Sequence, residues 1–317
     1  MAGKQISLLK TEQSHAKALG LDLLTGKEIM AILHEGQMAA TKSVSIAIPS
    51  LDKGAEAMAA AIRSGGNLVY AAAGSSGLMG LADGLEIPPT YGISTSRISI
   101  LRAGGLQDMA MPKGEAEDDS EAAKRDAKSI GKNDCVICLA ASGNTIYPVT
   151  IMNIAKTRGA TTIGISNNDD TLLIKGADIP VFLPTPPEVI AGSTRLGSGT
   201  AQKIALNMMS TLMGVRLGHV MDGLMVNVIA NNIKLLERAE NIVMEITGCN
   251  RNIASKNLKA ANGGVKQAIL ITSGAKDLSD AKNYLDMADQ NLRSAITNIT
   301  RAEPENRAIG ARKGDEQ

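Results

Sequence analysis

The stretch Asn67-Leu-Val-Tyr-Ala-Ala-Ala-Gly-Ser-Ser-Gly77 joins a short apolar run to a turn of glycines and serines. The same arrangement returns in Asp134-Cys-Val-Ile-Cys-Leu-Ala-Ala-Ser-Gly-Asn-Thr145, and a helical pattern follows each turn. Further apolar runs occur at 97–101, 161–165 and 179–183. Apolar runs that alternate with helical patterns indicate a parallel sheet with helices on both faces. We therefore predict an α/β fold with a central parallel sheet.

Helical patterns lie on both sides of this region. Before it, Thr25-Gly-Lys-Glu28 fits a capping box ahead of an apolar-periodic run. After it, helical stretches are expected near 224–246, 253–260 and 281–297. We predict three regions, which are an N-terminal helical extension (1–60), an α/β ligand-binding domain (61–225) and a C-terminal helical region (226–317).

The composition narrows the classes of partner. The chain has 317 residues, a formal net charge of +1, one Phe, four Tyr and no Trp. Without basic runs or aromatic platforms for stacking bases, nucleic acid is not an expected partner. No long uncharged apolar run and no signal-peptide core are present, so we expect a soluble cytoplasmic protein without membrane contact. Cys135 and Cys138 fall on one predicted strand and point to opposite faces, which indicates core thiols and not a metal pair.

Three segments rich in hydroxyls and glycines predict an anion site. In parallel sheets ligands bind at the carboxyl ends of the strands, where both serine turns fall. Hydroxyls and helix N-terminal N–H groups suit a phosphate monoester, whereas simple helix capping is the alternative. The third segment, Pro187–Lys203, precedes a helical pattern and would close the site. The hydroxyl-bearing residues of the two turns are Ser75, Ser76, Ser142 and Thr145, and Ser193-Thr194 form a third cluster.

Three acids are candidates for the site. Glu86 has apolar neighbours and precedes Pro88-Pro89, a setting that favours the protonated carboxyl that a general acid needs. A surface glutamate on a proline turn is the alternative. Glu117 lies in the acidic cluster Gly114–Asp119, which composition alone would assign to a solvated face. Glu188 lies in the third segment and is expected to face the bound ligand.

The chain resembles the N-acetylmuramic acid 6-phosphate etherase family, which has a SIS (sugar isomerase) domain. The resemblance covers about residues 8–300, and it implies a SIS-type αβα sandwich with helical extensions that works as a homodimer with a shared active site. The matching motifs are Thr11–Gln13, Gly74–Gly77, Glu86–Gly92, Ala103–Gly105, Gly114–Asp119, Ala140–Gly143, Pro187–Leu196 and Gly199–Lys203.

The resemblance also implies a reaction. The family cleaves the D-lactyl ether of N-acetylmuramic acid 6-phosphate, giving N-acetylglucosamine 6-phosphate and D-lactate without a metal or redox cofactor. A base removes the C2 proton of the open-chain sugar, an acid assists loss of lactate from C3, and water then adds. By motif position, Glu86 matches the acid and Glu117 the proposed base. The family's phosphate and sugar contacts match Ser75, Ser76, Ser142, Thr145 and Ser193 by position.

Both serine turns depart from the family pattern. The family usually has Ser-Gly-Arg-Leu-Gly in the first turn, where this chain has Ser76-Gly-Leu-Met-Gly80. It usually has Ser-Gly-Arg-Thr-Pro-Tyr in the second, where this chain has Ser142-Gly-Asn-Thr-Ile-Tyr147, and Gly84-Leu85 replaces the usual Ala-Ser before Glu86. Because arginine pairs strongly and selectively with anions, a related sugar phosphate stays open as the substrate. A phosphosugar aldose–ketose isomerase and a non-catalytic sugar-phosphate-binding regulator are the alternative functions.

Overall fold

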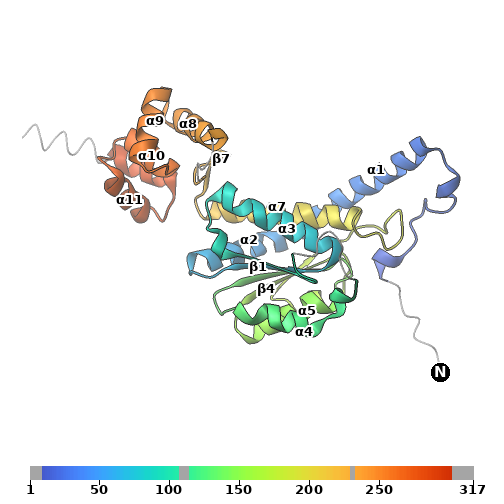
Figure 1. Ribbon diagram of the computed structural model, residues 1–317. Coiled ribbons are helices and arrows are strands. Elements are labelled where there is room, and N and C mark those ends of the chain that lie inside the picture. Colours follow the sequence, from blue (N-terminus) through green and yellow to red (C-terminus); the bar gives the residue numbers. More distant parts are fainter. Residues whose placement is uncertain (1–8, 107–113, 229–232, 302–317) are drawn as a thin grey trace, which may run out of the picture. The chain divides into compact units, whose positions relative to one another are not determined.

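The computed structural model describes residues 9–106, 114–228 and 233–301 (Figure 1). The chain forms two compact units. The first contains Met1–Leu85 with Ser94–Met213, and the second contains Glu86–Ile93 with Gly214–Gln317. These units do not coincide with the three regions expected from the sequence, because the N-terminal helices belong to the first unit and residues 86–93 to the second.

The first unit is built on a five-stranded parallel sheet. Its strand order is β2-β1-β3-β4-β5, and every predicted strand is present. The two central strands, β1 and β3, are buried along their whole length, which explains their continuous apolar runs. The predicted α/β class is confirmed. The strands are β1 (Leu68–Ala72), β2 (Ile98–Arg102), β3 (Cys135–Leu139), β4 (Thr161–Ser166) and β5 (Ile179–Phe182).

Helices cover both faces of this sheet. In Figure 1, α4 and α5 lie against one face, and α2, α3 and α7 lie against the other. Alternate residues of β1 and β3, such as Val69 and Val136, pack in one core cluster with Ala123 of α4 and Ile151 of α5. The helices are α1 (Gly26–Ser43), α2 (Ile48–Arg63), α3 (Gly74–Tyr91), α4 (Ser120–Asp126), α5 (Ile146–Thr157), α6 (Leu172–Gly176) and α7 (Gly197–Arg216).

The second unit contains a hairpin, which follows the end of α7, and a small core of helices. The hairpin strands are β6 (Val220–Met221) and β7 (Leu224–Met225), so the helix expected from Leu224 is wrong at its start. Asp222 and Gly223 both have positive φ (50° and 79°), the geometry of a two-residue hairpin turn. The helices are α8 (Ile233–Thr247), α9 (Arg251–Ala260), α10 (Val265–Thr272) and α11 (Leu278–Met287), with further helix at 292–301.

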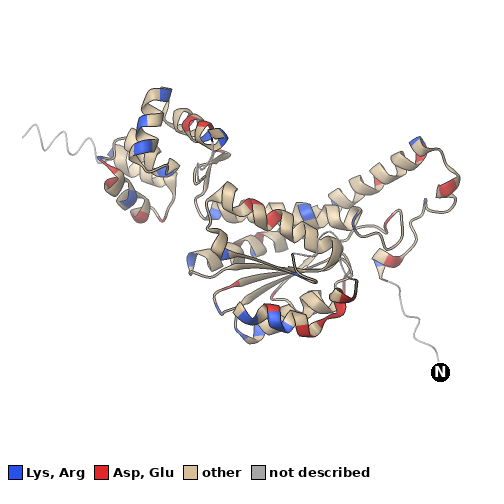
Figure 2. Cartoon of the chain, viewed as in Figure 1, with Lys and Arg blue, Asp and Glu red and all other residues tan. Residues whose placement is uncertain are grey.

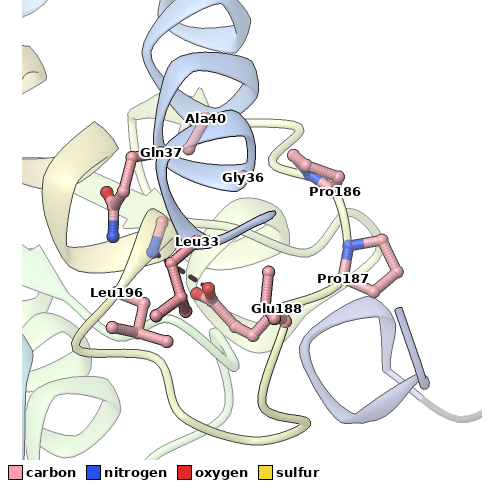
Figure 3. Close-up of a pocket in the computed structure, with 10 residues that line it drawn as sticks. Leu33, Gly36, Gln37, Ala40, Pro186, Pro187, Glu188 and Leu196 are labelled. Carbon is pink, nitrogen blue, oxygen red and sulfur yellow. Dashed lines mark hydrogen bonds between the residues drawn. The ribbon is translucent and has the colours of Figure 1, made fainter. Parts of the chain in front are cut away.

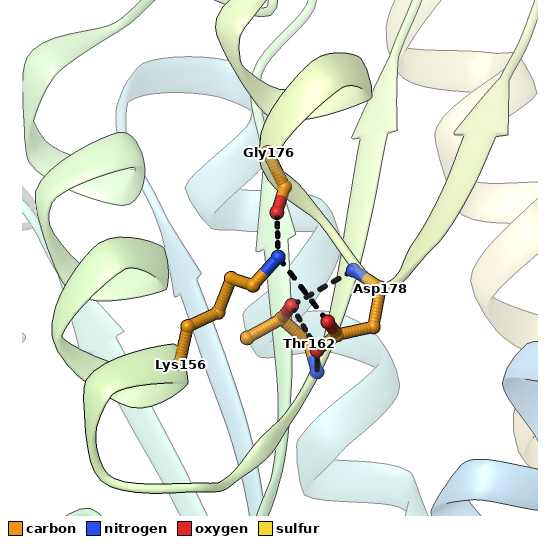
Figure 4. Close-up of polar contacts among 4 residues, drawn as sticks. All are labelled: Lys156, Thr162, Gly176 and Asp178. Carbon is orange, nitrogen blue, oxygen red and sulfur yellow. Dashed lines mark hydrogen bonds and ion pairs between the residues drawn. The ribbon is translucent and has the colours of Figure 1, made fainter.

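A polar cluster joins α5, β4 and β5 near the amino end of β4 (Figure 4). Oδ2 of Asp178 accepts hydrogen bonds from the backbone N (2.9 Å) and the hydroxyl (2.7 Å) of Thr162. The Lys156 Nζ lies 3.2 Å from Asp178 Oδ1 and also donates to the Gly176 carbonyl. Burial raises the pKa of Asp178, but the hydrogen bonds from Thr162 and the charge of Lys156 outweigh it and lower the pKa overall.

None of the described helices combines the length and apolar character needed to cross a membrane. The cytoplasmic location expected from the sequence stays a prediction.

Candidate active site

A cavity of about 180 Å³ lies at the carboxyl ends of β1 and β3. Both serine turns contribute to its wall, as expected for a parallel sheet. The 3₁₀ helix η5 (Gly114–Asp118), the N-terminal 3₁₀ helix η1 (Lys10–Glu12) and the loop before α7 complete it. The lining residues are Glu12, Ala73, Gly74, Ser75, Ser76, Glu117, Ala140, Ala141, Ser142, Thr145, Gly192 and Thr194.

The first serine turn forms the start of α3. Ser75 and Ser76 belong to the first helical turn, whose N–H groups have no acceptor within the helix. Gly74 has φ +51°, and a Cβ there would lie 2.6 Å from Oε1 of Glu117. The Glu117 carboxylate therefore lies over the start of α3, beside the two serines, in space that only glycine leaves open.

In the second serine turn, two hydroxyl groups contact each other. Ser142 Oγ lies 3.3 Å from Thr145 Oγ1, and Thr145 makes no side-chain cap to α5. Capping therefore does not explain the Thr145 hydroxyl. Asn144 accepts a hydrogen bond from the backbone N of Leu172 at 3.0 Å, so this residue supports the start of α6.

The loop before α7 brings an unexpected acid to the cavity. Gly192 and Thr194 line the wall, whereas Ser193 between them is half-buried and does not. The Gly192 N–H donates to the Thr11 carbonyl at 2.9 Å, which places Glu12 on the wall. Thr11–Gln13 was among the matching motifs, but sequence reasoning gave Glu12 no role.

Glu188, which the sequence predicted to face the ligand, lies outside this cavity. It is 4% exposed, and its two oxygens accept hydrogen bonds from the backbone N of Gly197 (2.9 Å) and Ser198 (2.8 Å). These amides begin α7, so the anion at this helix start is the protein's own carboxylate. Figure 3 shows the Glu188 side chain in the wall of another pocket, near Leu33 and Leu196.

Glu117 is half-buried within an acidic segment. Figure 2 shows acidic residues gathered just before and at the start of α4. Burial raises the pKa of the Glu117 carboxyl, and the charge of Asp118 raises it further, whereas the Arg102 guanidinium partly opposes them. A carboxylate whose pKa is raised is a better proton acceptor than an ordinary exposed glutamate.

Glu86 does not line the cavity. It lies in α3, exposed to solvent, and its neighbour Leu85 is 60% exposed. Pro88 and Pro89 are part of the same helix, so Glu86 is a surface glutamate, as in the alternative interpretation, but on a helix and not on a proline turn. Within its own chain, Glu86 therefore lacks the apolar surroundings that the sequence predicted.

The described residues contain no cluster of three or more His, Cys, Asp or Glu that could hold a metal ion. Cys135 and Cys138 are free thiols buried in β3, in agreement with their predicted core position. Burial raises the pKa of Cys135 to about 12, so this thiol is not ionised near neutral pH.

Comparison with known proteins identifies the family. The SIS domain family matches residues 106–212. An N-acetylmuramic acid 6-phosphate etherase of Geobacillus thermodenitrificans is 42% identical over 290 residues, which cover 91% of this chain and 98% of that protein. The chain belongs to the N-acetylmuramic acid 6-phosphate etherase family. Another etherase of this name, from Deinococcus radiodurans, is 38% identical over 289 residues, covering 90% of this chain and 95% of that protein.

Solved structures align with a smaller part of this chain than the etherases do. A phosphoheptose isomerase from Francisella tularensis aligns with 61% of the chain and 100% of its own length, at a TM-score of 0.47 and 16% identity.

Proposed function

We propose that this protein cleaves the D-lactyl ether of N-acetylmuramic acid 6-phosphate, yielding N-acetylglucosamine 6-phosphate and D-lactate. Etherases of this name match the chain over about nine tenths of its length. The observation that carries the proposal is the position of the Glu117 carboxylate over Gly74, beside Ser75 and Ser76. A carboxylate next to hydroxyls and free helix N–H groups suits a base that acts beside a bound phosphate.

In the proposed reaction, Glu117 is the base. The C2 hydrogen of the open-chain sugar is acidic because a carbonyl lies next to it, and Glu117 accepts this proton. The electron pair forms the C2–C3 double bond as the C3–O bond breaks, and lactate leaves with a proton from the acid. Water then adds at C3 and a proton returns to C2. The sum is one ether and one water converted to one alcohol and one hydroxy acid.

The hydroxyls hold the substrate in this proposal. Ser75 and Ser76, with the free amides of the first turn of α3, would bind the phosphate. Ser142 and Thr145 would bind the sugar from the second turn, and Ser193 would join them from the neighbouring loop. Glu188 acts indirectly, since its hydrogen bonds hold the start of α7.

We further propose a homodimer in which Glu86 is the acid in the pocket of a second copy. Two features support this. Glu86 is exposed and absent from the cavity wall of its own chain. The N-terminal region also exposes large apolar side chains, including Leu19 (99% exposed), Leu23 (85%) and Met30 (67%), which is typical of a surface that another chain covers.

Release of D-lactate from N-acetylmuramic acid 6-phosphate tests the proposal. We expect wild-type protein to release it and Glu117→Gln to lose at least about 10²-fold in kcat, the usual contribution of a positioned base. Glu115→Gln is the matched control, because Glu115 is an exposed acid of the same 3₁₀ helix that does not line the cavity. If folded wild-type protein released no lactate, the etherase assignment would be wrong.

A further inference from the structure

Arg102 is a buried cation that the proposed reaction does not use. It is the last residue of β2, lies in register with Ala72 of β1, and is 4% exposed. Its Nη1 donates to the Gly105 carbonyl at 3.1 Å, but its Nε is buried without a hydrogen-bond partner in the described part of the chain. A guanidinium stays charged when it is buried, and an unpaired buried charge is costly. A buried arginine at this position therefore needs an explanation.

Two glycines of α3 bring Arg102 beside Glu117. A Cβ at Gly77 would lie 3.1 Å from Arg102 Cγ and 3.4 Å from its Nε, so the arginine runs across this position. A Cβ at Gly74 would meet Glu117 Oε1 at 2.6 Å. Residues three apart share one face of a helix, with about 5–6 Å between their Cβ positions. The acid and the arginine therefore both lie over the first turn of α3, and the charge of Arg102 acts on the Glu117 carboxyl.

The charges of the cavity wall also indicate that a cation is needed near Glu117. Its described residues include the carboxylates of Glu12 and Glu117 but neither lysine nor arginine. Two carboxylates would repel an anionic phosphate unless a cation lies close by. The first turn carries Leu78 where the etherase family usually carries arginine. Arg102 crosses the same turn at Gly77, one residue from Leu78.

We propose that Arg102 is a positioning residue that holds Glu117 over Gly74 as a carboxylate and supplies the positive charge that the first serine turn lacks. The inference rests on the proposed role of Glu117 as the base. It gives the Gly74–Gly77 spacing a purpose, because a side chain at either position would occupy the space of one member of the pair. Arg102 itself does not line the cavity, so it acts through the position of Glu117 and through the field of its own charge.

Several charged groups surround Glu117. Asp118 follows it in η5, Glu12 faces the same cavity from η1, and Arg102 approaches from β2. Helix α5 also packs against η5, and its titratable groups are engaged elsewhere. Tyr147 donates to Asp126, and Lys156 pairs with Asp178. Among the described residues, Arg102 is thus the cation that opposes the effect of burial and of Asp118 on the pKa of Glu117.

The test is the titration of the Glu117 carboxyl by ¹³C NMR in substrate-free protein, with the resonance assigned by its loss in Glu117→Gln. We expect Arg102→Gln to move the midpoint to higher pH and Arg102→Lys to restore it toward the wild-type value. In the lactate assay, kcat/KM of Arg102→Gln should fall at least about tenfold on the acid limb and less on the alkaline side. An unchanged midpoint in folded Arg102→Gln would overturn the proposal.

A second pair of variants keeps the test decisive if Arg102→Gln does not fold. Gly77→Ala places a methyl against Arg102, and we expect it to shift the Glu117 midpoint as Arg102→Gln does. Gly84→Ala is the control, because its Cβ would meet Ile100 Cδ1 at a similar 3.2 Å on the same helix. Equal midpoints in these two variants would overturn the proposal. A shifted midpoint in a protein that releases no lactate would support the Arg102–Glu117 coupling and reject the etherase function alone.

Discussion

Replacement of Glu188 by glutamine shows whether this residue stabilises the start of α7 or contacts the ligand. Both carboxylate oxygens accept hydrogen bonds from amides at the start of α7, and the side chain is 4% exposed. A hydrogen bond to a charged group contributes about 1.5–3 kcal/mol net, and a neutral one about half of that. Glutamine keeps one acceptor, loses the charge and turns an N–H group toward an amide donor. We therefore expect Glu188→Gln to lower the free energy of unfolding by about 2–4 kcal/mol.

Urea unfolding measures this loss, and hydrogen–deuterium exchange of the peptide that contains residues 190–203 locates it. Glu121→Gln is the control, since its ion pair with Lys124 is exposed and should contribute less than about 0.5 kcal/mol. The amides of Gly197 and Ser198 should exchange faster only in Glu188→Gln. If this variant instead kept its full stability and raised KM, Glu188 would be a ligand contact and our account of it would be wrong.

Three further predictions follow from the same structure. Mixing inactive Glu86→Gln and Glu117→Gln proteins should restore about a quarter of wild-type activity. Random exchange of subunits makes half of the dimers mixed, and each mixed dimer has one intact site and one site that lacks both acids. No recovery after verified exchange would place both acids in one chain. Because burial and Asp118 raise the pKa of Glu117, kcat/KM should decline on the acid side at a pH above the ordinary pKa of glutamate, and a limb at the ordinary value would count against Glu117 as the base. The pKa of Asp178 is lowered in the folded state, so ionised Asp178 stabilises the fold at pH values above its unfolded pKa, and this stabilisation is lost as the pH falls through its folded pKa. Asp178→Asn should therefore lower the free energy of unfolding by about 0.5–1 kcal/mol at pH 7 and by little in acid, as measured by urea unfolding.

The sheet could be predicted from the sequence because each strand is a continuous apolar run between helical patterns. Such runs arise where strands are buried on both faces, as β1 and β3 are. The hairpin at β6 and β7 was missed although its Asp222-Gly223 turn is a known hairpin signal. The apolar pattern after it extended the predicted helix too far toward the N-terminus.

The site was predicted only in part, because it depends on contacts between distant segments. The two serine turns meet since they follow parallel strands, which the pattern already implied. The place of Glu188 depends on the path of the chain between residues 188 and 197, which composition does not reveal. The approach of Arg102 to Gly77 has no sequence signal at all, because an arginine that ends a strand is ordinarily solvated.

The measurement that tests the central claim most directly is the hydrogen content at C2 of N-acetylglucosamine 6-phosphate formed in D₂O, read by mass spectrometry and NMR. If Glu117 removes the C2 proton before lactate leaves, the wild-type product carries solvent deuterium at C2, and Glu117→Gln forms no product. A wild-type product that retains its original C2 hydrogen would contradict the account, because the ether would then break without deprotonation at C2.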